Sequence, residues 1–499
     1  MKRNRIKFVT ILFLGLSCAL YFSLIFNNNL WVDEAFSASI IREDWHTLIQ
    51  RTVDDTLPPF YNVAAKLFVS IFGFNAPVLK AFSVIPMALT IAFSASFFKK
   101  NFGTMPAIIS AVLLVGSPWL LHYGIEIRMY SWGLFFVTMA GLSAFSIDKS
   151  LSEARLVEKR DLLLISLWTA AAGYTHHFAL VSAGFIWLVL FLSNLSSIKS
   201  AKTPENKLAS WKNLKRFLIS AAFAFILYLP CFALAIYQIK NASSYFSLSP
   251  LSLSTLKSDL VYPFVTGYTP LSLLFLVSLA AWVVLHFTLG IRKGKASLSS
   301  FRFCYLGFAV YYMTLFFGYA VSFALGKSYF TARYLVPSLG LLWVSISLIP
   351  AELLSYVRDS EILNKSRESH SIIGCLCAWS AAVGLAVTLS SYMKEFKGEY
   401  FPRVDQMTEW FDENLGPNDG YLIYEDLYQI ELCFRYYYPD LKKYDWDSID
   451  QIKGNIWYFE VPGYEDYLEL CEEHGYGKIF IDDMNFDRYN FRLYKLEKL

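Results

Sequence analysis

Two pairs of adjacent carboxylates lie early in the chain, and both are candidates for acid–base chemistry. Asp33 and Glu34 directly follow the first long apolar run, and Asp54 and Asp55 precede a pair of prolines. A carboxylate at the outer end of a membrane helix is costly if it faces lipid, but it can act as a general base if it faces a reactive hydroxyl. By spacing alone, the simpler explanation for the first pair is that both carboxylates are solvated. The simpler explanation for the second pair is that it caps a helix, and contact with a substrate or a metal is the alternative.

Two later turns each combine cations with aromatic residues. Glu126, Arg128 and Tyr130 lie within EIRMY, and Lys327 and Arg333 lie within GKSYFTARYLVP. A guanidinium group suits a phosphate because it donates two parallel hydrogen bonds. The alternative is that Arg128 lies at the membrane interface and pairs with Glu126. Charge alone favours neither phosphate binding nor this alternative. Together the two turns predict a basic cluster that matches a phosphate or an anionic lipid headgroup.

The adjacent histidines His176 and His177 lie in GYTHHFAL, between two apolar runs. Successive side chains of one helix point apart, so the pair is a poor metal site. An interfacial position explains either histidine alone, whereas contact with a phosphate or protonation of a leaving group is the functional alternative. Of the seven cysteines, Cys433 and Cys471 lie in the polar C-terminal part, and we expect no disulfide bond between them.

The composition separates the chain into two parts of opposite charge. Only 17% of the 499 residues are charged and 55% are hydrophobic, whereas soluble domains carry about 25% charged residues. Residues 394–499 contain 24 acidic and 12 basic residues, and residues 1–393 contain 17 acidic and 32 basic residues. The overall net charge of +3 therefore combines parts of −12 and +15. This pattern excludes a soluble cytosolic enzyme, a disordered protein and a disulfide framework.

Long apolar runs predict eleven transmembrane helices, since a bilayer-spanning helix needs about 20 mostly apolar residues. The expected spans are 8–26, 78–98, 105–122, 129–147, 161–174, 177–194, 217–237, 270–290, 303–325, 334–356 and 371–392. Residues 58–73 are also apolar, but with this segment as an interfacial helix the inner segments hold 23 of the 32 basic residues. Because lysine and arginine accumulate in cytoplasmic loops, we expect a cytoplasmic N-terminus and an extracytoplasmic C-terminal part.

The candidate residues lie in or beside the predicted outer loops, so we expect the chemistry on the outer face. Residues 1–393 are expected to form a transmembrane catalytic domain. Residues 394–499 alternate predicted helices with the strands YLIYE, IWYFE and KIFID, which is typical of a small α/β sandwich. This second, soluble domain is expected on the outer side of the membrane.

The order of the motifs resembles that of a known family. Asp-Glu-Ala after the first span is followed by Asp-x-x-Pro-Pro-Phe-Tyr, Glu-x-Arg-Met-Tyr, Tyr-Thr-His-His-Phe and Ala-Arg-Tyr-Leu-x-Pro. Over roughly residues 8–393, this order resembles bacterial members of the dolichyl-phosphate-mannose–protein mannosyltransferase-like family of GT-C membrane glycosyltransferases (glycosyltransferase family 39-like). The resemblance implies a bundle of transmembrane helices with juxtamembrane helices in the first outer loop.

The resemblance also implies an activity and the roles of individual residues. A sugar would pass, with inversion, from a polyprenyl-phosphate donor to a glycan, lipid or protein at the outer face of the plasma membrane, with Asp33 as base and Glu34 in support. By motif position, the residues expected to contact the donor phosphate are Arg128, Tyr130, His176, His177, Arg333 and Tyr334. Lys327, in the same turn as Arg333, is expected to join them. Asp55, Tyr61 and Glu126 are expected to contact the acceptor or to support the site. The family histidine before the two prolines is Leu57 here, which weakens a metal or acceptor role for Asp55.

Two other functions stay open at the level of sequence. One is a polysaccharide polymerase or ligase that uses a lipid-diphosphate oligosaccharide, and the other is a transporter or flippase for lipid-linked sugars. Charged residues within the predicted spans are nearly absent, which disfavours a transport path at the membrane midplane. We expect no nucleic-acid partner, and the sequence establishes no cofactor while leaving a requirement for a divalent metal open.

Overall fold

The computed structural model describes most of the chain. Outside the described residues lie 1–14, 16–18, 27, 55, 243–247, 249, 266–268, 294–297, 360–366, 398–403, 424–427, 461–470 and 487–488, together with some side chains in neighbouring helices and strands. Asp55 and most of the first expected span therefore receive no structural account.

The chain divides into two compact units. The first comprises Met1–Leu24, Ile49–Ala64 and Lys80–Met393. The second comprises Ile25–Leu48, Ala65–Leu79 and Lys394–Leu499. The C-terminal segment is thus grouped with two parts of the first expected outer loop, including the part that carries Asp33 and Glu34.

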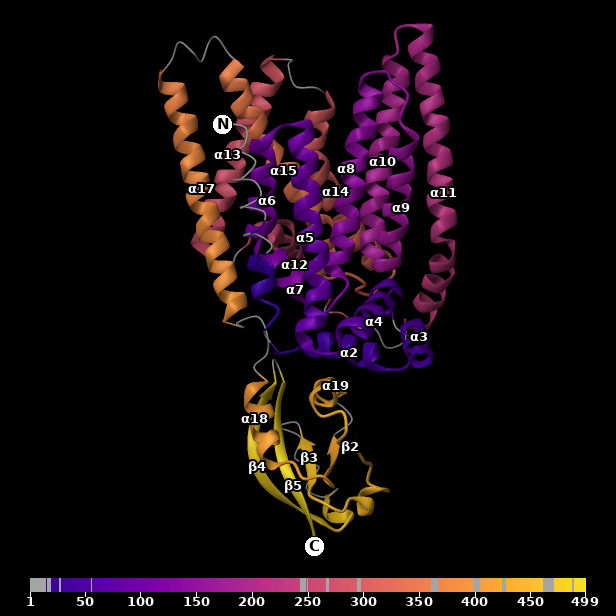
Figure 1. Ribbon diagram of the computed structural model, residues 1–499, viewed down its shortest axis with the longest axis vertical. Coiled ribbons are helices and arrows are strands. Elements are labelled where there is room, and N and C mark those ends of the chain that lie inside the picture. The colour runs from indigo at the N-terminus through magenta and orange to yellow at the C-terminus, as the bar shows by residue number, and fades with distance from the viewer. Residues whose placement is uncertain are drawn as a thin grey trace. The chain divides into compact units, whose positions relative to one another are not determined.

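The first unit is a bundle of long helices (Figure 1). Its helices are α5 (Ala76–Asn101), α6 (Thr104–Gly116), α7 (Pro118–Ile125), α8 (Tyr130–Ser152), α9 (Lys159–Thr175), α10 (His177–Ser200), α11 (Pro204–Ala242), α12 (Leu253–Val261), α13 (Thr269–Lys293), α14 (Leu298–Ala324), α15 (Val336–Asp359) and α17 (Arg367–Phe396), with the 3₁₀ helices η1 (Tyr262–Phe264) and η2 (Ala332–Leu335). In the apolar windows of α8 and α15, 83% of the residues are buried, whereas the other apolar windows are 22% to 56% buried. Helices α8 and α15 therefore form the centre of the bundle.

Seven described helices are long and apolar enough to cross a bilayer, and an eighth span is formed if α6 and α7 count as one helix bent by 66°. The prediction of a multi-pass helical membrane protein is confirmed. Of the other expected spans, 161–174 corresponds to α9, whose 17 residues reach about 26 Å, short of a bilayer core of about 30 Å. The spans expected at 8–26 and 371–392 fall partly outside the residues and side chains described.

Close approach of α14 and α15 depends on a small residue. A Cβ atom added to Gly307 of α14 would lie 2.5 Å from Cα of Leu342 and 2.6 Å from the carbonyl oxygen of Leu341, both in the α15 backbone. A larger side chain would separate the two helices. Small residues at such crossings are typical of membrane bundles, where dispersion contacts provide much of the packing energy.

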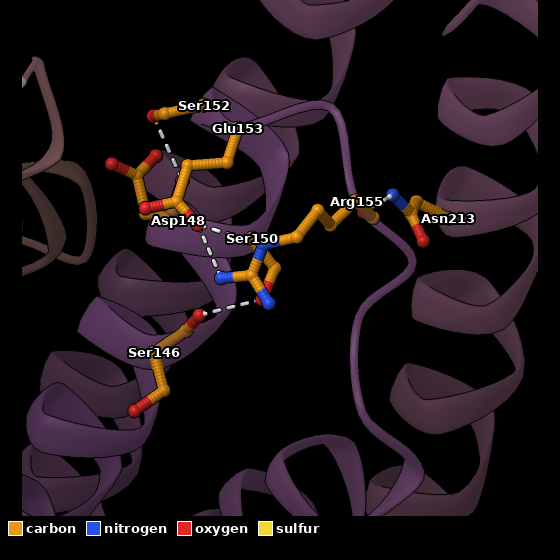
Figure 2. A network of polar contacts seen from close by, with 7 residues as sticks. All are labelled: Ser146, Asp148, Ser150, Ser152, Glu153, Arg155 and Asn213. Atoms are coloured by element: carbon orange, nitrogen blue, oxygen red, sulfur yellow. Dashed lines mark hydrogen bonds and ion pairs between the residues drawn. The ribbon is translucent and has the colours of Figure 1, made fainter.

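A polar network ends α8 and leads the chain toward α9 (Figure 2). The hydroxyls of Ser150 and Ser152 donate to carbonyl oxygens one turn earlier in α8, at 3.2 and 2.9 Å. The amide of Asn213 in α11 donates to the carbonyl of Arg155 at 2.8 Å, and its oxygen accepts from the N–H of Val157 at 3.0 Å. These bonds satisfy the backbone of a connection between helices, so the network has a structural role.

The second unit contains the helix α2 (Val32–Arg42) and a small mixed sheet. The segments α3 (Trp45–Asp54) and α4 (Phe60–Phe72) continue from α2 along the chain. The C-terminal elements are α18 (Asp405–Asn414), β1 (Gly420–Ile423), α19 (Tyr428–Tyr437), β2 (Lys442–Lys443), the 3₁₀ helix η4 (Ile449–Gln451), β3 (Ile456–Glu460), β4 (Tyr476–Phe486) and β5 (Tyr489–Lys498). The strand order is β2-β1-β3-β5-β4, with β1 parallel to β2 and β3, and β5 antiparallel to its two neighbours.

Aromatic residues fill the space between this sheet and its helices. The ring of Phe434 in α19 lies 4.9 Å from the rings of both Phe411 in α18 and Phe459 in β3. All three side chains are fully buried, which provides the apolar layer that a half-covered sheet needs. The prediction of a small C-terminal α/β fold is confirmed, and Cys433 and Cys471 are free thiols.

The ambiguous segment 58–73 contains α4, which has 13 residues. At 1.5 Å per residue, this helix is about 20 Å long, too short to cross a bilayer core of about 30 Å. The length of α4 therefore agrees with an interfacial helix at 58–73.

Candidate functional site

Asp33 and Glu34 lie in the first turn of α2, where they have different surroundings. Glu34 is fully buried, and its Oε2 accepts a hydrogen bond from the backbone N–H of Trp31 at 3.3 Å. This bond satisfies a donor that the start of a helix leaves without an intrahelical partner. Asp33 is only half-buried. The local structure thus gives Glu34 a capping role and leaves the Asp33 side chain accessible.

Tyr61 belongs to the first turn of α4 and has a buried hydroxyl contact. Its Oη lies 3.0 Å from Oγ of Ser83 in α5, and the side chain is 3% exposed. This pairing satisfies the hydroxyl inside the first unit, which is a structural role. Asp55, which the sequence motif places six residues earlier, is outside the described residues.

The turn between α7 and α8 buries the charged motif Glu126-Ile127-Arg128. The N–H of Arg128 donates to the carbonyl of Glu126 at 2.6 Å, which closes a tight turn. Glu126 and Tyr130 are fully buried, and Arg128 is 8% exposed. Burial of this kind does not fit an arginine that reaches out to headgroups. Within the described chain, the Tyr130 hydroxyl has no hydrogen-bond partner, although buried hydroxyls normally have one.

His176 lies at the N-cap of α10 and joins the same cluster. Its ring centroid is 5.7 Å from that of Tyr130 and 5.1 Å from that of Tyr334 in η2. Its Nδ1 accepts a hydrogen bond from the N–H of Phe178 at 3.1 Å, so in the neutral ring Nε2 carries the hydrogen.

Burial and neighbouring positive charge keep the His176 imidazole neutral. Desolvation is the largest cause that holds the pKa of His176 well below its ordinary value, followed by the charges of His177, Arg128 and Arg333. Arg128 and Arg333 therefore act on the same ring from two different turns of the chain. We name Arg128, Tyr130, His176, Arg333 and Tyr334 the basic cluster.

Two other residues predicted for the phosphate site, His177 and Lys327, are not among the five residues of the basic cluster. Nε2 of His177 lies 3.2 Å from the carbonyl oxygen of Thr56, so this histidine contacts the segment before the two prolines. The two adjacent histidines therefore have different contacts, His176 with the rings of Tyr130 and Tyr334 and His177 with the Thr56 carbonyl. Lys327 is half-buried in the turn that precedes η2.

An aromatic wall beside the basic cluster was not predicted from the sequence. The ring of Tyr123 lies 5.2 Å from Tyr130. Trp119, one turn earlier in α7, stacks on Tyr262 at 4.5 Å and donates from Nε1 to its carbonyl oxygen at 2.7 Å. The i, i+4 spacing of Trp119 and Tyr123 is the signal that could have placed both rings on one side of a short helix.

An apolar cavity of about 310 Å³ lies among α6, α13, α15 and α17. Its lining includes Met105, Leu113, Trp282, Trp343 and Ile349. A neighbouring pocket shares Leu113 and Trp343 with it and extends to Ser117 and Pro118, at the break between α6 and α7. Helix α7 continues from this break to the Glu126 turn.

Comparisons with known proteins identify the fold. The sequence matches no described protein family, and it matches no curated protein. ArnT from Cupriavidus metallidurans in the apo state has a similar structure, with a TM-score of 0.64 and 11% identity over 97% of each chain. The same enzyme bound to undecaprenyl phosphate gives a TM-score of 0.60 at 11% identity, also over 97% of each chain.

A looser match is the Archaeoglobus fulgidus oligosaccharyltransferase tethered to an acceptor peptide, with a TM-score of 0.46 and 11% identity over 98% of this chain and 74% of that chain. The two ArnT structures show that this chain has the fold of a GT-C membrane glycosyltransferase. The resemblance that the motifs indicated is confirmed at the level of fold.

Proposed function

We propose that this protein is a membrane glycosyltransferase that moves a sugar from a polyprenyl-phosphate donor to an acceptor hydroxyl, with inversion. The observation that carries the proposal is the basic cluster, which lies in a fold shared along 97% of the chain with an enzyme whose structure contains undecaprenyl phosphate. The acceptor would be a glycan, a lipid or a protein. The composition of the inner loops supports a cytoplasmic N-terminus and catalysis at the outer face of the plasma membrane.

The basic cluster fits the needs of the departing phosphate. A lipid monophosphate is a weak base, so its departure requires positive charge and hydrogen-bond donors more than a proton. Arg128 and Arg333 would provide the charge, and Nε2–H of His176 would provide a neutral donor. The buried Tyr130 hydroxyl, which lacks a protein partner in the described chain, would donate to the same group. Lys327, His177 and Tyr334 would support the phosphate site.

Asp33 would act on the acceptor. As the acceptor oxygen forms its bond to the anomeric carbon, the bond from that carbon to the phosphate oxygen breaks. The acceptor proton passes to the Asp33 carboxylate, and the lipid phosphate leaves as an anion. Direct displacement of this kind inverts the configuration at the anomeric carbon. Glu34 would keep the first turn of α2 in place through its bond to Trp31.

The apolar cavity supports a lipid-linked donor. Its lining by Trp282, Trp343 and aliphatic side chains suits an isoprenoid chain, which cannot form hydrogen bonds. The polar end of such a donor would then follow α6 and α7 to Arg128. A nucleotide-linked sugar has no comparable hydrocarbon part and would leave this cavity unused.

The test of the proposal is an in vitro transfer assay with purified protein in nanodiscs. A panel of polyprenyl-phosphate monosaccharides is the donor set, and extracted cell-envelope glycans, lipids and proteins are the acceptors. We expect Asp33→Asn to reduce turnover by about 100-fold or more, the usual contribution of a general base. Binding of a donor analogue should be retained, because Asp33 does not belong to the basic cluster.

Asp44→Asn is the matched control, because Asp44 is an exposed carboxylate that caps α3 through bonds to His46 and Thr47, and asparagine caps equally well. Undiminished turnover by Asp33→Asn would remove the proposed role of Asp33. Transfer from diphosphate-linked oligosaccharides alone would instead favour a polymerase or ligase.

A further inference from the structure

Three side chains of metal-ligand type meet at one end of α13, α14 and α15. They are His286, Cys304 and Glu352, one from each helix, and their ligand atoms all lie within 4.8 Å of one another. His286 and Cys304 are fully buried, and the Glu352 side chain is 13% exposed. The proposed sugar transfer makes no use of these residues.

Each ring nitrogen of His286 lies close to a side-chain oxygen atom. Its Nδ1 lies 2.7 Å from the hydroxyl of Tyr305, and its Nε2 lies 2.8 Å from Oε2 of Glu352. A histidine that binds a metal usually donates its other ring N–H to an oxygen, which fixes the tautomer and the ring orientation. These distances fit a ring whose Nε2–H donates to the Glu352 carboxylate and whose Nδ1 accepts from the Tyr305 hydroxyl. Metal binding would place the ring hydrogen on Nδ1, which would then donate to the Tyr305 oxygen and leave the Nε2 lone pair for the ion.

We propose that His286, Cys304 and Glu352 bind one Zn²⁺ ion. A thiolate, a carboxylate and a neutral imidazole together carry a charge of −2, which the ion balances, so no net charge is buried within the helices. A thiolate and an imidazole favour zinc over magnesium or calcium, which prefer oxygen ligands.

The spacing of the ligand atoms requires a small adjustment on binding. Bonds of about 2.0 to 2.3 Å in a tetrahedral site place ligand atoms roughly 3.3 to 3.8 Å apart. The Nε2–Oε2 pair at 2.8 Å would open by roughly half an ångström, and the widest pair would close by about 1 Å. Rotation of the Glu352 and Cys304 side chains provides movements of this size, and water would occupy the fourth position.

The zinc site is separate from the basic cluster and would have a structural role. Glu352 lies 16 residues after Val336, the first residue of α15, which corresponds to about 24 Å along the helix from η2. The ion would therefore join three helices at the end of the bundle opposite to Arg333. By the proposed topology this end is cytoplasmic, where cysteines stay reduced and the Cys304 thiol stays available.

The experiment measures zinc in the purified full-length protein. The protein in detergent is treated with EDTA, loaded with zinc sulfate, dialysed and analysed by mass spectrometry for metals. We expect about one zinc per chain, as for a site with a single set of ligands, and we expect its loss in Cys304→Ser and His286→Gln. Cys231→Ser is the matched control, because Cys231 is also a buried cysteine of the bundle but belongs to α11.

Two further measurements keep the proposal testable if a variant folds poorly. Loading with Co²⁺ should produce a thiolate-to-cobalt absorption band in the unsubstituted protein and in Cys231→Ser, and not in Cys304→Ser. Zinc should raise the midpoint of thermal unfolding of the unsubstituted protein and leave that of Cys304→Ser unchanged. Absence of bound zinc and of the cobalt band in the unsubstituted protein would overturn the proposal, as would equal zinc content in Cys304→Ser.

Discussion

At the scale of residues, burial distinguishes neighbours that the sequence treats alike. Glu34 is fully buried and caps α2, whereas Asp33 is half-buried. His176 contacts the rings of the basic cluster, whereas His177 contacts Thr56. The sequence could name each pair, because motifs record residue types and order. It could not divide the tasks within a pair, since that division depends on side-chain directions set by distant turns of the chain.

The two arginines of the basic cluster lead to a prediction for donor binding. Arg128→Ala and Arg333→Ala should each weaken binding of a polyprenyl-phosphate donor analogue by about 10- to 100-fold, because a hydrogen bond to a charged group contributes about 1.5 to 3 kcal/mol. Titration of the analogue by calorimetry measures the effect. Arg155→Ala is the control, because Arg155 is exposed and pairs with Glu153 in the α8–α9 connection. Equal affinities of all three variants would refute the phosphate role.

The lowered pKa of His176 predicts how stability depends on pH. Folding holds this pKa well below its ordinary value, chiefly through burial, so below about pH 6.5 the unfolded chain binds a proton that the folded protein does not. Stability from this residue should therefore fall as the pH decreases from 7.5 to 5. Thermal unfolding of the protein and of His176→Asn, which keeps a capping residue, should show a difference that changes with pH. A constant difference would contradict the lowered pKa.

At the scale of elements, one turn of α19 holds both ends of α2 within the second unit. The Tyr437 hydroxyl donates to the carbonyl of Asn28 at 2.8 Å and accepts from the N–H of Leu30 at 3.0 Å. The Arg42 guanidinium donates to the carbonyls of Arg435 and Tyr436 at 3.2 and 3.0 Å. It also lies 4.7 Å from the ring centroid of Phe74. The helix that carries Asp33 thus depends on residues near the other end of the chain.

Loss of this contact should impair catalysis more than donor binding. Arg42→Ala removes two hydrogen bonds to the C-terminal carbonyls of α19, each worth about 1.5 kcal/mol because the donor is charged. It also removes a cation–π contact worth about 0.5 to 1 kcal/mol at an exposed site. We expect a lower kcat, an unchanged KM for the donor and partial rescue by Arg42→Lys. Steady-state kinetics measures these changes.

Arg435→Ala is the control for Arg42→Ala, because it removes a neighbouring guanidinium but keeps the backbone carbonyl that accepts from Arg42. A fall in kcat as large as that of Arg42→Ala would show that general loss of charge, and not the contact with α2, is responsible.

The long helices and the strands of the C-terminal part could be predicted, because each carries its own apolar pattern. The expected strands IWYFE and KIFID lie in β3 and β4. Helix α2 could not be recognised from its residues, since its sequence VDEAFSASIIR has a weak apolar face. Its bonds to α19 join residues about 400 positions apart, and no local pattern records such a pairing. The break between α6 and α7 was also missed, because 105–122 is apolar enough on average to read as one span, although Gly116, Ser117 and Pro118 lie at the break.

At the scale of the whole molecule, the two charge classes of the sequence have separate locations. The acidic residues of 394–499 belong to the second unit, and the basic loops that are expected on the inner side belong to the first. The net charge of +3 therefore describes neither part. The charge distribution instead determines which way the chain enters the membrane.

The proposed topology can be tested with reporter fusions. Alkaline phosphatase is active only outside the cytoplasm, so a fusion after Leu499 should be active. A fusion within the basic connection between α10 and α11, for example after Lys202, should be inactive. Green fluorescent protein at the same two positions should give the opposite result. An inactive phosphatase after Leu499 would reverse the assignment of the two sides.

The bonds between α2 and α19 also have a consequence for biosynthesis. Asn28 and Tyr437 are 409 positions apart in the chain, a distance that takes about 20 to 80 s to translate. During that time α2 has emerged from the ribosome without the partners that fix its two ends. The contacts that hold the helix with the proposed base therefore form only when synthesis is nearly finished. A chain interrupted before α19 would contain the helical bundle but would lack the residues that hold α2.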